Sequence, residues 1–159
     1  GALKLYDDYV FDVNSVEGLT MSNAISLLAR LDFLGVNVGE RWQRLVPGSV
    51  FRIGHHTNPF NDCHYAYALA RAGATAALND LLSSMRAASG IKTHAGNLLQ
   101  EVGVPVAMGL ASLANGDYGT AFGELEPVWN KIWMLGGSNA QRDFFDQAIM
   151  LSLNGLAKN

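Results

Sequence analysis

Cysteine is almost absent from this sequence: Cys63 is the only one among 159 residues, which excludes an internal disulfide framework. Charge is scarce too, at 16% of residues against roughly 25% in an average globular protein. No basic run is present and the net charge is −3, which argues against nucleic acid and anionic membranes as partners. No apolar run approaches the roughly 18 residues of a membrane span, and no signal peptide is visible. We therefore expect a cytoplasmic protein.

Strand patterns are also missing, whereas helical periodicity is common. Hydrophobic residues make up 49% of the chain, which is long enough for one domain, residues 1–159, with a real core. Met21, Ile25 and Leu28 recur at the spacing of one helix face. The predicted helices cover about 21–34, 39–54, 59–73, 74–88, 97–114, 118–135 and 138 to near the end.

Glycine, proline and capping residues set the predicted helix ends. Pro47 should kink or break the helix at 39–54, and Pro105 should bend or split the one at 97–114. Residues 89–96 form the only long connector and are the best candidate for a mobile loop. Ser138, with Gln141 three residues later, matches a capping box.

The turns are short, so neighbouring helices should be antiparallel. If Gly116 is the turn glycine of a tetratricopeptide unit, Gly109 and Ala121 fall at the small-residue positions of its two helices. We expect these two residues at the closest helix–helix approach. Gly73 fits the same role less well. The sequence therefore predicts an all-α fold of about seven antiparallel helices, stacked as a right-handed tetratricopeptide-like α-α superhelix.

Several stretches occur in the order seen in one known family. They are Leu27–Leu31, Val36–Trp42, Phe60–His64, Glu101–Val106 and Gly136–Asp143. On these residues the chain resembles the C-terminal part of the tetratricopeptide repeat protein 38 family over roughly residues 25–155. The resemblance implies a helical-repeat fold and a fragment of a longer repeat protein, and it implies no reaction. Upstream repeats would then cover apolar surface, which fits the low charge.

Polar residues around the helix that starts at Pro59 form the first candidate site. These candidates are His56, Asn61, Asp62 and His64. A metal site would use His56, Asp62 and His64, with His55 as a further option, although no metalloprotease spacing is present. The structural alternative is that Asn61 and Asp62 satisfy free N–H groups of the first turn while His64 hydrogen-bonds to a neighbouring helix.

Nucleophilic chemistry has less support in the sequence. Cys63 and His64 are adjacent and point about 100° apart on a helix, so they do not form a dyad. Cys63 falls on the apolar stripe, and we expect a buried structural thiol. No Ser-His-Asp constellation is apparent.

The second candidate site is Gln141, Arg142 and Asp143, at a helix start where an anion or a partner's carboxylate could dock. The competing interpretation is structural: Gln141 caps the helix, and Arg142 pairs with Asp146 or with an acid on another helix. Trp129 and Trp133, four residues apart, could line a groove or lie in an interface.

Taken together, these features favour a scaffold module that binds a protein or peptide, without catalysis or a cofactor. The alternative is a metal-assisted enzyme or a small-ligand site around His56, Asp62 and His64. At the N-terminus, an apolar stripe is formed by Leu3, Tyr6 and Val10. We expect that the helix that would pack on this stripe, in an upstream repeat, is missing. We therefore expect self-association through the N-terminal helices, or fraying of residues 1–12.

Overall fold

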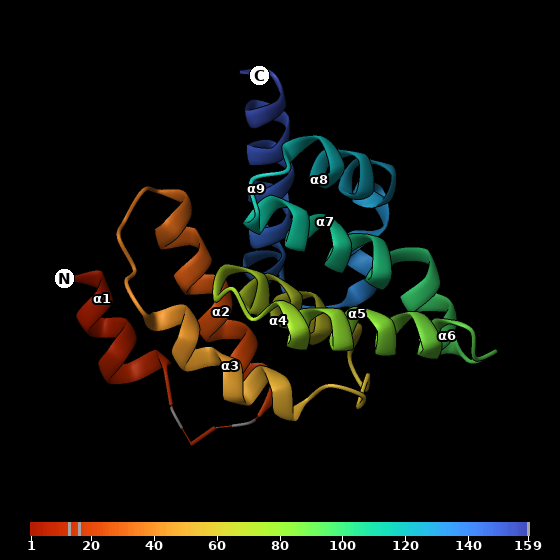
Figure 1. Cartoon of the computed structure of the whole chain (residues 1–159), viewed down its shortest axis with the longest axis horizontal. Helices are drawn as coiled ribbons and strands as arrows, with labels where there is room; N and C mark the ends of the chain where they lie inside the picture. The colour runs from red at the N-terminus through yellow and green to blue at the C-terminus, as the bar shows by residue number, and fades with distance from the viewer. Residues whose placement is uncertain (13, 16, 159) are drawn as a thin grey trace.

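The structure, a computed structural model, describes residues 1–12, 14–15 and 17–158, and within these ranges it is helical and without strands (Figure 1). The helices are α1 (Ala2–Leu5), η1 (Tyr6–Val10), α2 (Gly18–Phe33), α3 (Arg41–Phe51), α4 (Pro59–Arg71), α5 (Thr75–Ser89), α6 (His94–Leu98), η2 (Leu99–Gly103), α7 (Val104–Ala114), α8 (Tyr118–Leu125), η3 (Glu126–Leu135) and α9 (Asn139–Leu156). Because α1–η1, α6–η2–α7 and α8–η3 each run on without a break, this part of the chain holds 8 helices. The eighth helix, beside the seven predicted ranges, is the N-terminal one, through which self-association was expected.

Helix α4 lies at the centre of the molecule (Figure 1). From Pro59 to Ala70, every residue except Asn61 is buried. Helices α2, α3, α5 and α7 all pack against it. Such all-round burial requires small and apolar side chains, which the alanine-rich second half of α4 supplies. The start of α4 is consequently held on a rigid, enclosed element.

Two antiparallel hairpins, α4/α5 and α7/α8, turn at Gly73 and Gly116, whose φ values are +69° and +77°. Only glycine adopts such angles at no steric cost. A Cβ atom added to Gly109 would lie 2.5 Å from Cγ of Leu125 and 3.2 Å from the carbonyl oxygen of Ala121. The predicted close approach of α7 and α8 at Gly109 and Ala121 is therefore confirmed.

Of the outcomes predicted for the two prolines, the break at Pro47 and the split at Pro105 do not occur. Pro47 lies inside α3 without breaking it. The carbonyl that its missing N–H would have bonded belongs to Gln43, an exposed residue, so water can take that place. Pro105 follows the π-helical turn η2, which widens the helix without splitting it. The long connector is also shorter than predicted, because α6 already begins at His94, where the Thr93 hydroxyl accepts a hydrogen bond from the Gly96 N–H.

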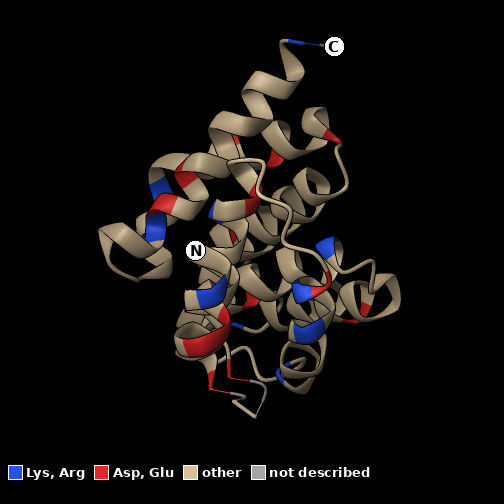
Figure 2. Cartoon of the chain, turned by 90° about the vertical axis from the view of Figure 1, so that its left-hand side faces the viewer, with Lys and Arg blue, Asp and Glu red and all other residues tan. Residues whose placement is uncertain are grey.

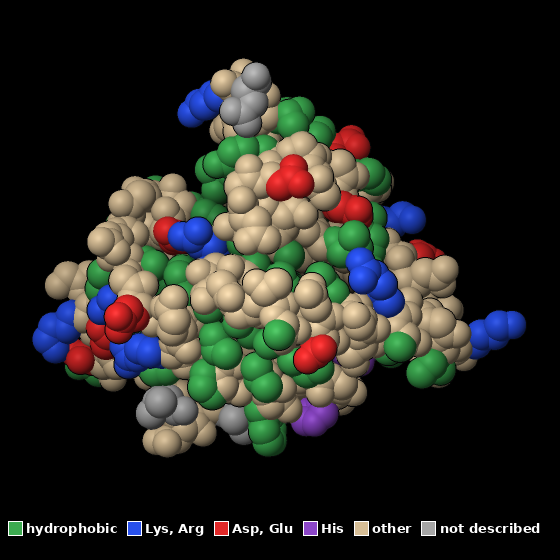
Figure 3. Space-filling model, viewed as in Figure 1, with side chains coloured by type: hydrophobic (Ala, Val, Ile, Leu, Met, Phe, Trp, Pro, Cys, Tyr) green, Lys and Arg blue, Asp and Glu red, His purple; other side chains and the backbone are tan. Residues whose placement is uncertain are grey.

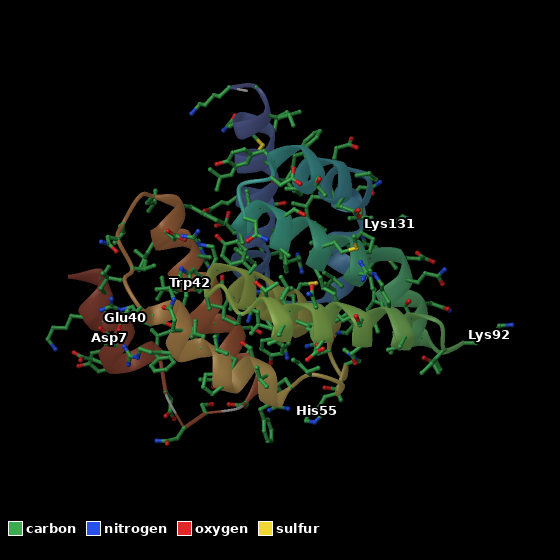
Figure 4. The ribbon with its side chains drawn as sticks, viewed as in Figure 1. Asp7, Glu40, Trp42, His55, Lys92 and Lys131 are labelled. Carbon is green, nitrogen blue, oxygen red and sulfur yellow. The ribbon has the colours of Figure 1, made fainter. Side chains whose placement is uncertain are left out.

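The N-terminal helix folds back onto the rest of the chain, so the expectation that its apolar stripe lacks a cover is wrong. Tyr6 is fully buried and stacks on Phe11, and η1 packs against α2. Arg41 donates two hydrogen bonds to Asp7, at 2.6 and 3.1 Å, and Arg44 donates a third at 3.0 Å. These pairs hold η1 against the start of α3, and Figure 4 shows Asp7 beside Glu40 there. Self-association is thus no longer needed to cover the stripe.

The last helix, α9, packs on α8 and also reaches α2, the first long helix. Phe144 on α9 stacks on Phe33 at the end of α2, with ring centroids 6.0 Å apart. The first long helix and the last helix are therefore in contact.

Candidate functional site

The first candidate residues lie in the loop between α3 and α4 and at the start of α4, near the centre of the fold. The side chain of Asn58 caps α4 by accepting a hydrogen bond from the Phe60 N–H at 3.1 Å, and Pro59 occupies the first turn. Both features follow the predicted helix start. The cap fixes the direction in which residues 54–58 enter α4.

His56 is the central residue of this loop. Its φ is +44°, a left-handed conformation that is uncommon for residues other than glycine. Its side chain is 8% exposed and uses both ring nitrogens. Nδ1 lies 3.1 Å from Oδ2 of Asp62, and Nε2 lies 2.7 Å from Oγ of Ser84. A carboxylate can only accept, so Nδ1 donates to Asp62. In the neutral tautomer that carries its proton on Nδ1, Nε2 accepts a hydrogen bond from the Ser84 hydroxyl.

Ser84 was not among the residues predicted from the sequence. It lies on α5, 28 residues beyond His56. The available signal was the register of the α4/α5 hairpin. Asp62 stands eleven residues before the turn at Gly73 and Ser84 eleven residues after it. An antiparallel pair of helices places such positions opposite one another, where one histidine can bridge them.

A cavity of about 20 Å³ adjoins His56 and Asp62. Its lining residues are Arg52, His55, His56, Thr57, Asn58, Asn61, Asp62 and Tyr65. This volume suits about one water molecule. The hydroxyl of Tyr65 is buried and has no hydrogen-bond partner among the described residues, and burial raises its pKa to about 12. A donor at this position remains protonated at physiological pH.

His64 lies outside this cluster, and its predicted hydrogen bond to a neighbouring helix is wrong. Its Nδ1 donates to the carbonyl oxygen of Phe60 on the same helix, at 2.8 Å, and its Nε2 has no partner in the described chain. The ring packs against Phe60, Phe144 and Phe145. Burial lowers its pKa to about 4. In the part of the chain that the structure describes, no three His, Cys, Asp or Glu side chains gather as metal ligands would.

The remaining polar and thiol residues of α4 make contacts within the fold. Asn61 accepts a hydrogen bond from the Ser22 hydroxyl at 2.7 Å, which ties α4 to α2. Cys63 is fully buried, and its thiol contacts the Gly103 carbonyl oxygen at 3.5 Å. Burial raises the pKa of this thiol, so it stays protonated and unreactive. His55 is exposed beside Phe51 and points away from the body of the molecule (Figure 4).

The residues of the second candidate site lie at the start of α9, where they form a helix cap. Ser138 and Gln141 form the predicted capping box. Arg142 donates to the carbonyl oxygens of Gly136 and Gly137 and to Oδ1 of Asn139. Its predicted pairing with an acid is therefore wrong, because the left-handed turn of the two glycines brings unpaired carbonyls within its reach.

Acidic residues of the same helix face a surface groove instead. Asp143 lies 4.0 Å from Arg30 of α2, and Asp146 accepts a hydrogen bond from the Trp129 indole at 2.8 Å. The α2–α9 groove has a volume of about 380 Å³. It is lined by Phe33, Leu34, Asp143, Asp146, Gln147, Met150, Leu151 and Asn154. Trp129 and Trp133 are both exposed on η3.

The chain matches no protein-family model and no solved structure. Among the described residues, no helix combines the length and the apolar character that a membrane crossing requires.

Proposed function

We propose that the protein is a tetratricopeptide-like scaffold module that binds an amphipathic helix of a protein partner in the α2–α9 groove. The observation that carries the proposal is the apolar surface left uncovered there. Leu34 is 80% exposed at the end of α2, and Met150 is 45% exposed on α9. An exposed apolar groove with a polar rim is typical of sites that receive one face of a partner helix.

The length and composition of the groove fit that partner. From Asp143 to Asn154, α9 spans about 16 Å at the usual rise, which accommodates two to three turns of a docked helix. Residues 147–157 include no charged side chain (Figures 2 and 3). The C-terminal half of α9 therefore presents apolar and amide groups. A partner must therefore supply a mainly apolar face.

The charges on the rim favour a basic partner. Asp143 and Asp146 both line the groove, and Asp146 forms no ion pair with any residue that the structure describes. A lysine or arginine flanking the apolar face of the partner would pair with it. The net charge of −3 also attracts a positively charged partner at long range.

The helical hairpins α4/α5 and α7/α8, with turn glycines at Gly73 and Gly116, support the tetratricopeptide-like part of the proposal. Each hairpin packs against the next through α4 and α7, as stacked repeats do. A cytoplasmic location belongs to the same proposal, because the one cysteine is a free buried thiol.

A designed peptide tests the proposal. A 14-residue amphipathic helix with leucine at every third or fourth position and lysine on both flanks is titrated calorimetrically into the protein, at low and at high salt.

Met150→Asp should weaken binding by about tenfold or more, since it buries a charge in the groove. Asp146→Asn should weaken it at low salt only. Ile91→Asp, at an exposed site in the Gly90–Thr93 connector, is the matched control and should leave binding unchanged. Equal affinity in Met150→Asp and the control would refute the proposal.

A further inference from the structure

The side chains of Ser84, His56 and Asp62 form a continuous hydrogen-bonded array from a hydroxyl through an imidazole to a carboxylate. We propose that Ser84 is a nucleophile that takes the acyl group of small activated carboxylic esters. His56 acts as its general base, and Asp62 is the positioning residue. This activity is independent of the α2–α9 groove.

The distances meet what such an array needs. The Ser84 Oγ–His56 Nε2 separation of 2.7 Å and the His56 Nδ1–Asp62 Oδ2 separation of 3.1 Å are both hydrogen-bond contacts. With its proton on Nδ1, the imidazole presents an unprotonated Nε2 to the hydroxyl. Nε2 is thus ready to accept the Ser84 proton when Oγ attacks.

The surroundings of the array hold this tautomer in place. The side chain of Asp62 is 3% exposed, so its oxygen bonds His56 in preference to bulk water. The positive φ of His56 is a strained conformation for a side-chain-bearing residue. Strain of this kind persists where surrounding contacts over-determine a residue, and it is concentrated at active sites.

The reaction proceeds in two balanced steps. Oγ of Ser84 attacks the ester carbonyl carbon, and the hydroxyl proton passes to Nε2 of His56. The carbon–oxygen bond to the leaving alcohol then breaks, and the alcohol departs with that proton, leaving an acyl-serine. Water later attacks the acyl carbonyl with His56 as base, which releases the carboxylic acid and restores Ser84.

The geometry also limits the substrate and the turnover. Ser84 is half-buried in the middle of α5, and a Cβ atom on Gly54 would lie only 3.9 Å from its Oγ. The nearby cavity of about 20 Å³ is lined by His56 and Asp62 but not by Ser84, and it suits only about one water molecule, so the acyl group must reach Ser84 from the solvent side. The Ser84 N–H belongs to the interior of α5 and is not free to stabilise an oxyanion. Loss of one such donor costs about a hundredfold in rate, so we expect stoichiometric acylation and slow release.

The test uses p-nitrophenyl acetate and the intact protein. Mass spectrometry with peptide mapping follows acetylation over time, alongside release of p-nitrophenolate. Ser84 should be acetylated at least about tenfold faster than Ser83, its exposed neighbour on α5, because only Ser84 has a base. Ser84→Ala should abolish the adduct, and Ser83→Ala should leave it unchanged.

Asp62→Asn separates positioning from a merely structural contact. The amide disturbs the tautomer of His56, so the Ser84 acetylation rate should fall by about a hundredfold or more. The melting temperature and circular dichroism of the variant are measured in parallel, and His56→Gln serves as a second variant if Asp62→Asn unfolds. Acetylation of Ser84 no faster than of Ser83, or an unchanged rate in a folded Asp62→Asn or His56→Gln variant, would overturn the proposal and leave the array as a link between the loop and α5.

Discussion

The imidazole ring of His64 lies 5.1 Å from the phenyl ring of Phe144, centroid to centroid, although one residue belongs to the central helix and the other to the last. An ionisable group is thereby enclosed among aromatic rings, with no exposed atom surface. This enclosure is the cause of its lowered pKa of about 4.

The stability of the protein should therefore decrease in mild acid. Below the unfolded-state pKa of 6.5, the unfolded chain binds a proton at His64 that the folded protein does not take up until about pH 4. The free energy of unfolding should fall by about 2 kcal/mol between pH 7 and pH 5 through this residue alone. In His64→Phe that loss should be absent, whereas in the exposed His55→Gln it should persist. Urea unfolding at the two pH values measures it, and an equal acid slope in His64→Phe and the wild type would disprove the assignment.

A second prediction concerns the contact of α7 with α8. Gly109→Ala should lower the free energy of unfolding by about 1–3 kcal/mol, and Gly109→Leu by about 2–4 kcal/mol, because the added atoms meet Leu125 and Ala121. The control is Gly123→Ala on α8, where a Cβ atom would meet nothing within 4 Å. That change should stabilise the protein by about 0.5–1 kcal/mol through helix propensity. Chemical denaturation of the variants decides it, and similar values for Gly109→Ala and Gly123→Ala would show that the helices are not in close contact.

A third prediction tests how the N-terminal helix is held. Tyr6→Ala should destabilise the protein by about 3–5 kcal/mol, because it leaves a cavity under η1. Tyr6→Phe should be close to neutral, since the buried hydroxyl has no hydrogen-bond partner in the described chain. Hydrogen exchange of residues 3–11 gives a second readout and should show slow exchange. Rapid exchange there, together with a small effect of Tyr6→Ala, would indicate that the segment frays.

The general features of the fold could be predicted from the sequence because they depend on local signals. Gly73 and Gly116 mark turns through backbone conformation, Asn58 and Ser138 mark helix starts through capping, and apolar spacing gives the helices between them. These signals need no knowledge of what lies across the core. The close approach at Gly109 could be predicted for the same reason, since it follows from hairpin register.

The parts that were missed depend on contacts between residues far apart in the chain. Nothing near Tyr6 indicates that Arg41 will hold Asp7, which lies 34 residues earlier. The helical position of His64 suits either a polar contact or the core. The side chain lies in the core because Phe144, from the distant helix α9, packs against its ring. The contact of Ser84 with His56 could not be predicted for the same reason, because nothing in the sequence around a serine inside a helix indicates that a histidine lies opposite it.

Backbone amide chemical shifts test most directly whether the α2–α9 groove binds a partner helix. The lysine- and leucine-bearing peptide is added to isotope-labelled protein, and the shifted amides are mapped. Saturable shifts are expected at Phe33 and Leu34 and along α9 from Asp143 to Asn154, and all of them should be reduced in Met150→Asp. Shifts confined to other surfaces, such as the exposed tryptophans of η3, or no shift at any site, would contradict it.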